Sequence, residues 1–339
     1  MRLPELDIQG LVLVWGFPQG SHRSTFLARA LGMNIEHAYL TRRQGKLHAL
    51  YKYPIQAAIT LRVLARRRPQ VVIVQNPPIF AAMVVYLWAC LAGVRFIIDS
   101  HTDALQAAWW AWSLPLHGFL ARRAITTIVT NDHLKKQVVA WHANAFVLMD
   151  PPFVLSERCP VCLDKAPFNV VVVSTASYDE PIAHIMEAAG QLPDVAFHVT
   201  GNFTNQLGIV AAAPPNVRFT GYVPDAEYYG LLEAAQVVMC LTTENHTIQS
   251  GAGEALWLGK PIITSDWPLL REYFSRGTMH VDNSASSILR AVLTMKDNLP
   301  TYEAEIQALE HERRCEWRDQ ASALIALIQN TTTNSARGG

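Results

Sequence analysis

Short apolar segments that end in polar loops alternate with helical segments along most of this chain. Leu11 to Trp15 is followed by the turn "GFPQGSHRS" and by a predicted helix over residues 25–31. Val71 to Gln75 is followed by "QNPP" and a predicted helix over Ile79 to Ala92. Strands separated by single helices form βαβ units, and the strands of such units are parallel. The spacing therefore predicts an α/β chain built on parallel sheets.

A proline-rich segment interrupts this alternation once. It reads "MDPPFVLSERCPVCLDKAPF" and covers Met149 to Phe168, after which strands and helices resume. A chain of 339 residues, 50% of them apolar, is long enough for two hydrophobic cores. We therefore predict a first domain over residues 1–152, a second domain over 153–330 that ends in a long amphipathic helix, and a disordered tail over 331–339.

The chain shows no targeting or membrane-spanning signal. Its first residues carry acids and reach Gly-Phe-Pro too early for a signal peptide, and its longest apolar run, Ile79 to Val94, is shorter than the roughly twenty residues that cross a bilayer. The five cysteines have no disulfide spacing, and Cys159 and Cys162 form a lone C-x-x-C that lacks two further zinc ligands. We expect a cytoplasmic protein without a metal site or cofactor.

The charges are divided unevenly between the two halves. Residues 1–150 hold 16 Lys and Arg against 7 Asp and Glu, which leaves 12 against 21 in the remainder, so charges of +9 and −9 cancel overall. A basic field attracts phosphates or an anionic membrane surface, which would place the protein peripherally at the inner face of a membrane. The alternative, most relevant to Arg66 to Arg68, is a solvated helix face. No nucleic-acid-binding motif accompanies the charge, so we expect no nucleic-acid partner.

Polar loops follow the predicted strands in both domains. Ligands of open α/β sheets bind beyond the carboxyl ends of the strands. Neither a G-x-G-x-x-G fingerprint nor a P-loop is present, which argues against a dinucleotide enzyme or a P-loop kinase. The loops that we expect to line a ligand site cover residues 16–24, 75–78, 99–103, 174–179, 200–202 and 242–253.

The segment "SGAGEALWLG", Ser250 to Gly259, has the features of an anion site. Its small residues come before Glu254 and a predicted helix over Ala255 to Leu258. Free backbone N–H groups and the positive end of the helix dipole favour a diphosphate at such a helix start. Glu254 could accept hydrogen bonds from two vicinal hydroxyls of a ribose. The alternative is a carboxylate favoured at the helix start by the dipole alone.

The same segment resembles a known signature. "EALWLGKPIITSD" is similar to the "EALACGKPVV" motif of the GT-B glycosyltransferases, in particular of the large retaining family 4. Looser similarity covers "GFPQGS", "VVIVQNPP", "DSHTDA", "VTNDHLKK" and "GYVPDAEYYGLLEAAQVVMCLTT". "QNPP" and "STASYDEP" resemble the β-mannosyltransferases that extend dolichol-linked chitobiose. The resemblance implies the GT-B fold, two Rossmann-like parallel-sheet domains facing a central cleft.

The resemblance also implies roles for individual residues. Glu254 would bind the ribose, residues 250–252 the diphosphate, and Tyr222 would border the base. His101 or Asp103 would be the catalytic base if the enzyme inverts, whereas a retaining enzyme needs none. The implied donor-binding residues are Gly20, Ser21, Ser174, Thr175, Ser177, Gly201, Tyr222, His246, Thr247, Ser250, Gly251, Ala252 and Glu254.

Two departures from the family pattern concern the donor. The position of the first glutamate in the family's E-x7-E motif is His246, and Glu244 could replace that glutamate only if the loop is differently wound. "STASYDEP" also lacks the Arg and Lys that many relatives carry after this strand. Phosphate neutralisation would then depend on hydroxyls and helix N–H groups.

The function that this resemblance implies is transfer of a sugar from a nucleotide-diphosphate donor to a hydroxyl acceptor. Trp109, Trp110 and Trp112 in "AAWWAWSLPLHGFLARR" suggest a membrane-interface segment, and with it a glycan or polyprenyl-linked acceptor, although a buried helix would also contain them. Two alternatives stay open: a GT-B-fold nucleotide-sugar epimerase and a non-catalytic GT-B-like subunit.

Overall fold

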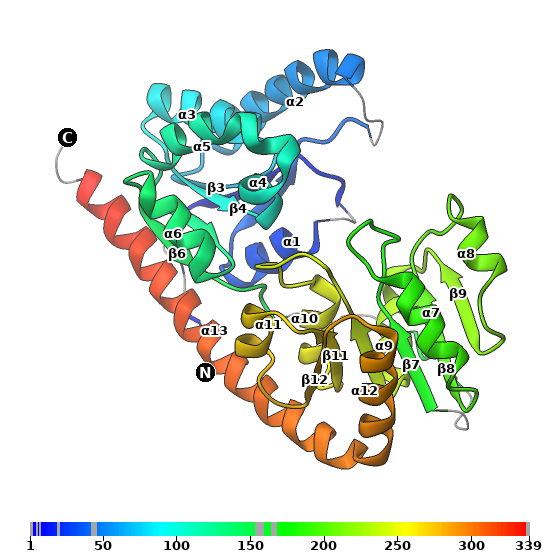
Figure 1. Cartoon of the computed structure of the whole chain (residues 1–339). Coiled ribbons are helices and arrows are strands. Elements are labelled where there is room, and N and C mark those ends of the chain that lie inside the picture. Colours follow the sequence, from blue (N-terminus) through cyan, green and yellow to red (C-terminus); the bar gives the residue numbers. More distant parts are fainter. Residues whose placement is uncertain are drawn as a thin grey trace. The chain divides into compact units, whose positions relative to one another are not determined.

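The computed structural model describes residues 3, 4, 6, 8–18, 21–41, 46–152, 159–163 and 168–336 (Figure 1). The chain divides into two compact units. The first unit combines residues 1–152 with residues 315–339, and the second covers residues 153–314.

The first unit is built on a six-stranded sheet in the order β2-β1-β3-β4-β5-β6, with every neighbouring pair parallel. Its strands are β1 (Gly10–Val14), β2 (Asn34–His37), β3 (Val71–Asn76), β4 (Arg95–Ser100), β5 (Thr127–Val129) and β6 (Ala145–Val147). Its helices are α1 (His22–Ala30), α2 (Lys46–Arg67), α3 (Ile79–Ala92), α4 (Thr102–Gln106), the 3-10 helix η2 (Ala108–Ser113), α5 (Leu114–Ala121) and α6 (Asp132–Ala140).

Both faces of this sheet are covered. Val12, Val14 and Ile73 belong to the apolar cluster on one face, and Leu11 and Leu13 belong to the cluster on the other. Strands that are buried on both faces have nearly continuous apolar sequences, because each successive side chain meets a core. This explains why the strands were recognisable as apolar runs.

The second unit repeats the architecture with the strand order β12-β11-β10-β7-β8-β9, again parallel throughout. Its strands are β7 (Phe168–Val172), β8 (Val195–Thr200), β9 (Val217–Gly221), β10 (Val237–Cys240), β11 (Ile262–Ser265) and β12 (Thr278–Val281). Its helices are α7 (Ile182–Gly190), α8 (Leu207–Ala211), α9 (Asp225–Ala234), α10 (Ser250–Trp257), α11 (Pro268–Tyr273) and α12 (Ala285–Asp297).

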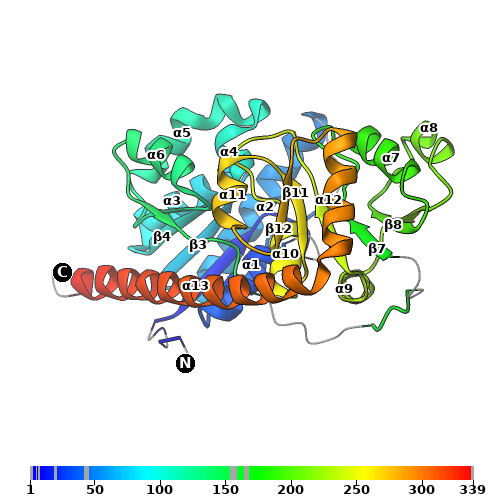
Figure 2. The same ribbon diagram turned by 60° about the horizontal axis from the view of Figure 1, so that its bottom comes forward.

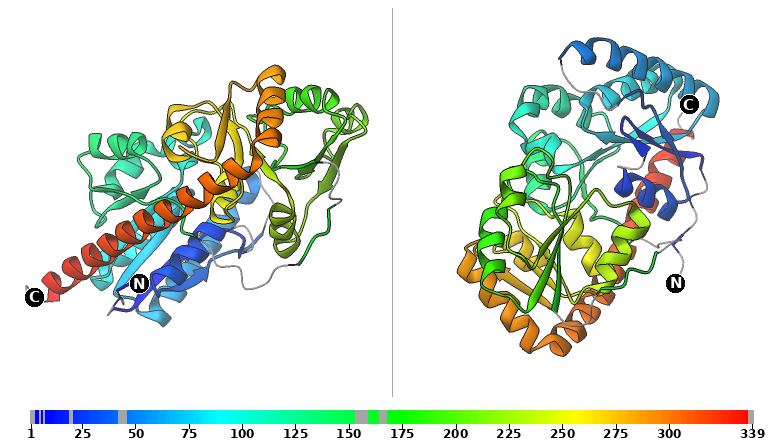
Figure 3. Two further views of the ribbon diagram at one scale, coloured as in Figure 1. Left: turned by 90° about the horizontal axis from the view of Figure 1, so that it is seen from below. Right: turned by 90° about the vertical axis from the view of Figure 1, so that its right-hand side faces the viewer.

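The last helix, α13 (Leu299–Ala336), is one unbroken element (Figures 2 and 3). Ile306 is buried against Gly277 in the second unit, where a Cβ on the glycine would lie 2.5 Å from the Ile306 Cβ. From residue 315 onward the helix groups with the first unit instead: Trp317 packs in its core and donates a hydrogen bond from Nε1 to the Met149 carbonyl at 3.1 Å. This differs from our assignment of residues up to 330 to the second domain, and the helix also continues to residue 336 where we predicted a tail.

The predicted α/β fold with two parallel sheets is confirmed, and the helix expected at Ile79 to Ala92 is α3. Within the residues that the structure describes, no helix is both long and apolar enough to cross a membrane.

Candidate active site

Helix α10 begins earlier than the sequence predicted. It starts at Ser250 rather than Ala255, so the small residues form its first turn and Glu254 lies on the second. The small residues are needed for packing, because a Cβ on Gly251 would lie 2.5 Å from Val173 Cγ1 and 3.0 Å from Cys240 Sγ. The start of α10 therefore sits directly against the carboxyl ends of β7 and β10. Ala252 is buried in the same turn, whereas Ser250 is exposed.

The Glu254 carboxylate is held by two tyrosines of α9. Tyr228 donates its hydroxyl hydrogen to Oε2 at 2.6 Å, and Tyr229 donates to Oε1 at 3.3 Å. Burial, followed by the charge of Glu254, raises the pKa of both phenols above their usual range, so both stay protonated as donors. A carboxylate has about four lone-pair sites, so the two phenols use only part of its acceptor capacity. The two phenols therefore fix the orientation of the Glu254 carboxylate.

The three hydroxyl residues after β7 already share an anionic partner. Glu180, just before α7, accepts hydrogen bonds from the Ser174 hydroxyl, from the Thr175 amide at 2.9 Å and from the Ser177 amide at 3.3 Å. The Thr175 hydroxyl also donates to Glu180, at 3.1 Å. The structure thus brings Ser174, Thr175 and Ser177 together as predicted. Their donors are bonded to the Glu180 carboxylate, at the place where we expected a ligand phosphate.

Neighbouring strand ends fix this loop in place. The hydroxyl of Thr200 accepts a hydrogen bond from the Ser174 amide at 3.1 Å, and a Cβ on Gly201 would lie 2.4 Å from the Ser174 carbonyl oxygen. Gly201 has φ of 102°, which glycine adopts without strain. Tyr222 follows β9 and is 74% exposed. Gly201 therefore acts through close packing of the backbone, and the Tyr222 ring lies open to solvent.

The loop between β10 and α10 is tied to the loop before α7. Thr242 donates its hydroxyl hydrogen to Asp179 Oδ2 at 2.6 Å and accepts the Glu244 amide at 3.0 Å. His246 adopts a left-handed φ of 63°, and its amide is bonded to Asn245 Oδ1 at 2.7 Å. The Glu244 side chain is exposed and Thr247 is half-buried. The loop thus has a left-handed residue at His246, the position at which the family motif has its first glutamate.

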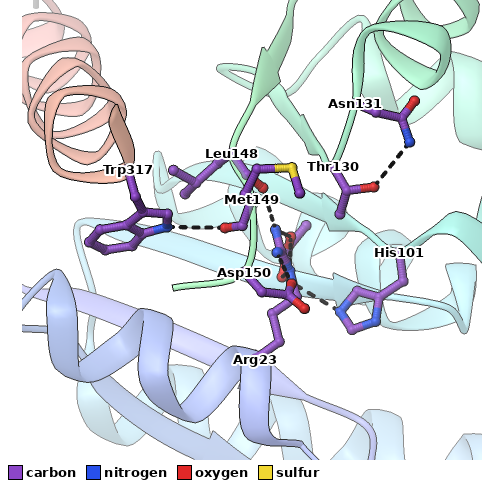
Figure 4. A network of polar contacts seen from close by, with 9 residues as sticks. Arg23, His101, Thr130, Asn131, Leu148, Met149, Asp150 and Trp317 are labelled. Atoms are coloured by element: carbon purple, nitrogen blue, oxygen red, sulfur yellow. Dashed lines mark hydrogen bonds and ion pairs between the residues drawn. The ribbon is translucent and has the colours of Figure 1, made fainter. Parts of the chain in front are cut away.

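The first unit has a centre of its own at the end of β4 (Figure 4). His101 Nε2 lies 3.7 Å from Asp99 Oδ2, a distance too long for a hydrogen bond but suited to an ion pair when the imidazole is protonated. Arg23 of α1 contacts the same carboxylate, with Nη2 at 3.0 Å from Oδ1 and Nε at 3.3 Å from both oxygens. Arg23 also donates to the Leu148 carbonyl at 3.1 Å and pairs with Asp150.

Asp99 is ionised in this centre. Burial disfavours its charge, but the Arg23 guanidinium and His101 outweigh burial and hold the pKa of Asp99 well below its usual range. The pKa of Arg23 is correspondingly raised, because the charges of Asp99 and Asp150 outweigh its burial. The result is a charged cluster in which Asp99 faces both a permanent cation and His101.

A second histidine, His117 of α5, lies in the core beside the end of β4, the strand that precedes His101. His117 is fully buried, its Nε2 is 2.9 Å from the Ser100 hydroxyl, and Asn76 Nδ2 is 3.3 Å from the same nitrogen. Burial lowers the pKa of His117 to about 4, although a hydrogen bond to the Ala104 backbone opposes the shift. The Asn76 carbonyl accepts the His101 amide at 2.9 Å. His117 thus supports the backbone that carries His101.

Three other predicted residues of the first unit do not join this centre in the same way. Asp103 is exposed on α4, and Asp99 rather than Asp103 faces the His101 ring. Ser21 is buried and donates its hydroxyl hydrogen to the Phe17 carbonyl at 2.9 Å, which closes the turn after β1. Gly20 lies outside the described residues.

Sequence reasoning missed the residues that orient these groups. The residues that it missed are Arg23, Asp150, Glu180, Tyr228 and Tyr229. Each contacts a partner that is distant in sequence, or a partner that it meets only because of the conformation of a loop. The one available signal was composition: "STASYDEP" has two acids in a loop that was expected to bind phosphate.

Part of the second unit matches a known family. Residues 180–320 match the glycosyl transferase-like family, and this range includes Glu180, both tyrosines, α10 and Glu254. No curated protein matches the sequence significantly.

Several solved structures share the fold over nearly the whole chain. Sucrose-phosphate synthase from Thermosynechococcus elongatus has a TM-score of 0.73 at 13% identity and covers 96% of this chain and 100% of its own. Anabaena HepE, in complex with UDP and glucose, has a TM-score of 0.69 at 14% identity, with the same 96% and 100% coverage. A Listeria monocytogenes protein assigned as a UDP-N-acetylglucosamine 2-epimerase has a TM-score of 0.71 at 12% identity and 98% coverage of both chains. The protein therefore has the two-domain Rossmann-like GT-B fold, as the sequence predicted.

The cysteines and other metal-ligating side chains form no further centre in the described part of the chain. Cys159 and Cys162 are exposed and free, and no group of three or more His, Cys, Asp and Glu is placed to hold a metal ion there. That the reaction needs no metal stays a prediction.

Proposed function

We propose that the protein is a glycosyltransferase that moves a sugar from a nucleoside-diphosphate donor to a hydroxyl acceptor. The observation that carries this proposal is the geometry of Glu254, a carboxylate held by two tyrosines beside a glycine-rich helix start. The family match over residues 180–320 supports it independently. HepE, a structural neighbour, is in complex with UDP-glucose in one of its structures, which supports a nucleotide-sugar donor.

In this proposal Glu254 binds the donor ribose. The Glu254 carboxylate accepts hydrogen bonds from the two vicinal ribose hydroxyls, and the tyrosines fix the carboxylate in the required orientation. The ligand therefore finds a preorganised acceptor pair, which reduces the entropy lost on binding.

The Ser250 and Gly251 amides at the start of α10 receive the diphosphate, because the Ala252 and Gly253 amides donate to the Gln249 carbonyl at 3.1 and 3.2 Å. During transfer the bond between the anomeric carbon and the phosphate oxygen breaks, and the departing diphosphate gains negative charge. N–H groups at a helix start stabilise that charge most when they are already oriented, as the packing of Gly251 ensures here.

His101 is the proposed base for the acceptor hydroxyl. Nε2 faces Asp99 at 3.7 Å, so Nδ1 is the nitrogen proposed to take the proton of the acceptor hydroxyl while the acceptor oxygen bonds to the anomeric carbon. Asp99 is a positioning residue, which stabilises the imidazolium that forms. This role belongs to an inverting reaction, so the anomeric configuration of the product tests it directly: a retained configuration would remove His101 as the base.

The activity test uses purified protein with a panel of UDP-, GDP- and ADP-sugars, with and without hydroxyl acceptors. We expect nucleoside diphosphate release that depends on both an active donor and an acceptor. Release of an altered free sugar without acceptor would instead identify an epimerase. This is the activity to which the Listeria neighbour is assigned. Binding without any turnover would favour a non-catalytic subunit and would contradict the proposal.

We further propose a glycan or polyprenyl-linked acceptor, presented at an anionic membrane surface. The support is a set of exposed apolar side chains on the first unit, with Leu50 at 74%, Trp109 at 57% and Trp112 at 60% exposure. Arg62 and Arg66 are exposed on α2, the helix that carries Leu50. Indole rings and cations favour the headgroup region of a bilayer. This association is also what would make the protein peripheral to a membrane.

Co-sedimentation with vesicles that contain anionic lipid tests the membrane contact. Arg62→Gln with Arg66→Gln, and separately Trp109→Ala, should each reduce the bound fraction. A matched control is Arg290→Gln on α12 of the second unit. Equal binding of all the variants would contradict the membrane proposal but leave the transferase proposal intact.

A further inference from the structure

The loop between β7 and α7 has the form of an anion-binding nest. Ala176 has a left-handed φ of 61°, and the amides of Thr175 and Ser177 on either side of it both point at Glu180. Successive N–H groups around a left-handed residue make a concavity that suits an anion. Two hydroxyl donors, from Ser174 and Thr175, complete the set. The four donors match the acceptor capacity of one carboxylate.

The nest is held in place at both ends of its loop. The carbonyl of Ser174 packs against Gly201, and Asp179, one residue before Glu180, anchors the far end of the loop. The Asp179 carbonyl accepts the Thr243 amide at 2.8 Å, and its carboxylate accepts the Thr242 hydroxyl. A loop that is held at both ends cannot easily move away from its anion.

The charge of Glu180 reaches the start of α10. The Cys240 thiol lies beneath Gly251, and its pKa is raised by burial and then by the charges of Glu254 and Glu180. A ligand phosphate at the α10 start therefore lies within the field of the Glu180 carboxylate. Like charges repel, so the Glu180 carboxylate opposes the binding of that phosphate.

Three basic side chains of the second unit have partners outside the loop that contains Glu180. Arg271 pairs with Asp266 and Arg276 with Glu312, while Lys260 donates to the Ala235 carbonyl. None of these contacts involves the loop that contains Glu180.

We infer that Glu180 is the resident anion of this nest, and that a donor phosphate reaches the Ser174, Thr175 and Ser177 donors only by displacing the Glu180 carboxylate. Glu180 is then a specificity residue: it lowers the affinity for the anionic part of the donor while leaving the affinity for the nucleoside part unchanged. The inference rests on the proposed function, because it gives the diphosphate of that donor this loop as a second contact beside the α10 amides.

The first test compares Glu180→Gln with the wild type. Glutamine keeps the length of the side chain and a hydrogen-bond acceptor but removes the charge. Dissociation constants are measured by calorimetry for UDP, GDP and ADP and for the matching nucleosides, with Glu187→Gln, at an exposed position of α7, as control. We expect Glu180→Gln to bind the preferred diphosphate about three- to tenfold more tightly, with nucleoside affinity unchanged within about twofold. An unchanged or weaker diphosphate affinity would overturn the inference.

The second test does not require a nucleotide. Glu180→Ala empties the nest, so inorganic phosphate should raise the melting temperature of Glu180→Ala by several degrees more than that of the wild type or Glu187→Ala. Equal shifts in all three proteins would count against a nest. If no nucleotide binds to any variant but phosphate stabilises Glu180→Ala, the proposed function fails and the nest stands. If nucleotides bind and neither Glu180 variant responds as expected, the nest fails and the proposed function stands.

Discussion

The His101 centre of the first unit and the Glu254 centre of the second unit both depend on a carboxylate, but they hold it in opposite ways. Asp99 is buried and faces the Arg23 guanidinium, so its charge is compensated within the protein. Glu254 is half-buried and is held by two neutral phenols, which orient its carboxylate. A carboxylate that faces a guanidinium is suited to positioning a neighbour such as His101, whereas phenol donors orient a carboxylate without neutralising its charge.

The largest effect is expected from breaking the compensated pair. Arg23→Gln would leave Asp99 buried without its cation, which typically costs about 3 to 5 kcal/mol in the free energy of unfolding. Urea denaturation of the variant measures this loss. The double variant Arg23→Gln with Asp99→Asn should regain much of it, because no buried charge is left unpaired. A loss below about 1 kcal/mol for Arg23→Gln would show that Asp99 does not depend on Arg23.

The shared helix α13 gives a matched pair of core substitutions. Trp317→Ala should lower the unfolding free energy of the first unit by about 3 to 5 kcal/mol, and Ile306→Ala that of the second unit by about 2 to 5 kcal/mol. Hydrogen exchange resolved along the chain would assign each loss to its unit. If Trp317→Ala loosened the second unit instead, residues 315–336 would belong there, as the sequence analysis had assumed.

Acid should weaken the first unit through His117. The pKa of this ring is lowered to about 4 in the folded protein, from an ordinary value of 6.5 in the unfolded chain. Between these pH values the unfolded chain binds a proton at His117 and the folded protein does not. The free energy of unfolding therefore falls as the pH falls from about 6.5 to 4, by up to about 3 kcal/mol. The Asp99 pair does not contribute in this window, because its carboxyl titrates lower.

Unfolding experiments across this pH range, on wild type and His117→Gln, measure that contribution. The slope of stability against pH should be shallower in the variant. A variant with the same slope as the wild type would assign the acid sensitivity to other groups, such as His198 and His280 of the second unit, whose pKa values are also lowered by burial.

The smallest effects concern the tyrosines that hold Glu254. Tyr228→Phe removes the 2.6 Å hydrogen bond to Oε2 and should destabilise the second unit by about 1.5 to 2 kcal/mol, because hydrogen bonds to charged groups are stronger than neutral ones. Tyr229→Phe removes the 3.3 Å contact and should cost less. Thermal unfolding of the two variants compares them directly. A larger loss for Tyr229→Phe would reverse the assignment of which phenol orients the carboxylate.

The sequence predicted those parts of the molecule that depend on local patterns. Buried strands such as β3, and the helix α3 after it, were recognisable because each apolar run meets a core on its faces. The glycine-rich start of α10 was recognisable by composition, although its first helical residue was placed at Ala255 instead of Ser250, since Ser and Gly are poor helix formers.

Contacts between distant segments could not be predicted in this way. Arg23 is 76 residues from Asp99, and Tyr228 is 26 residues from Glu254. Their pairing follows from strand order, which a single sequence does not reveal. The same reason explains why the end of α13 was assigned to the wrong core: an amphipathic helix shows that it has an apolar face, but not what that face covers.

The central claim is that Glu254 is the nucleoside anchor of a donor site. Calorimetric titration of wild type, Glu254→Gln and the exposed control Glu227→Gln with the nucleoside diphosphate that binds best tests it most directly. We expect Glu254→Gln to weaken binding at least tenfold and Glu227→Gln to leave it unchanged, and we expect a smaller loss when a 2′-deoxyribose ligand is used. Equal affinity of wild type and Glu254→Gln for the ribose ligand would contradict it.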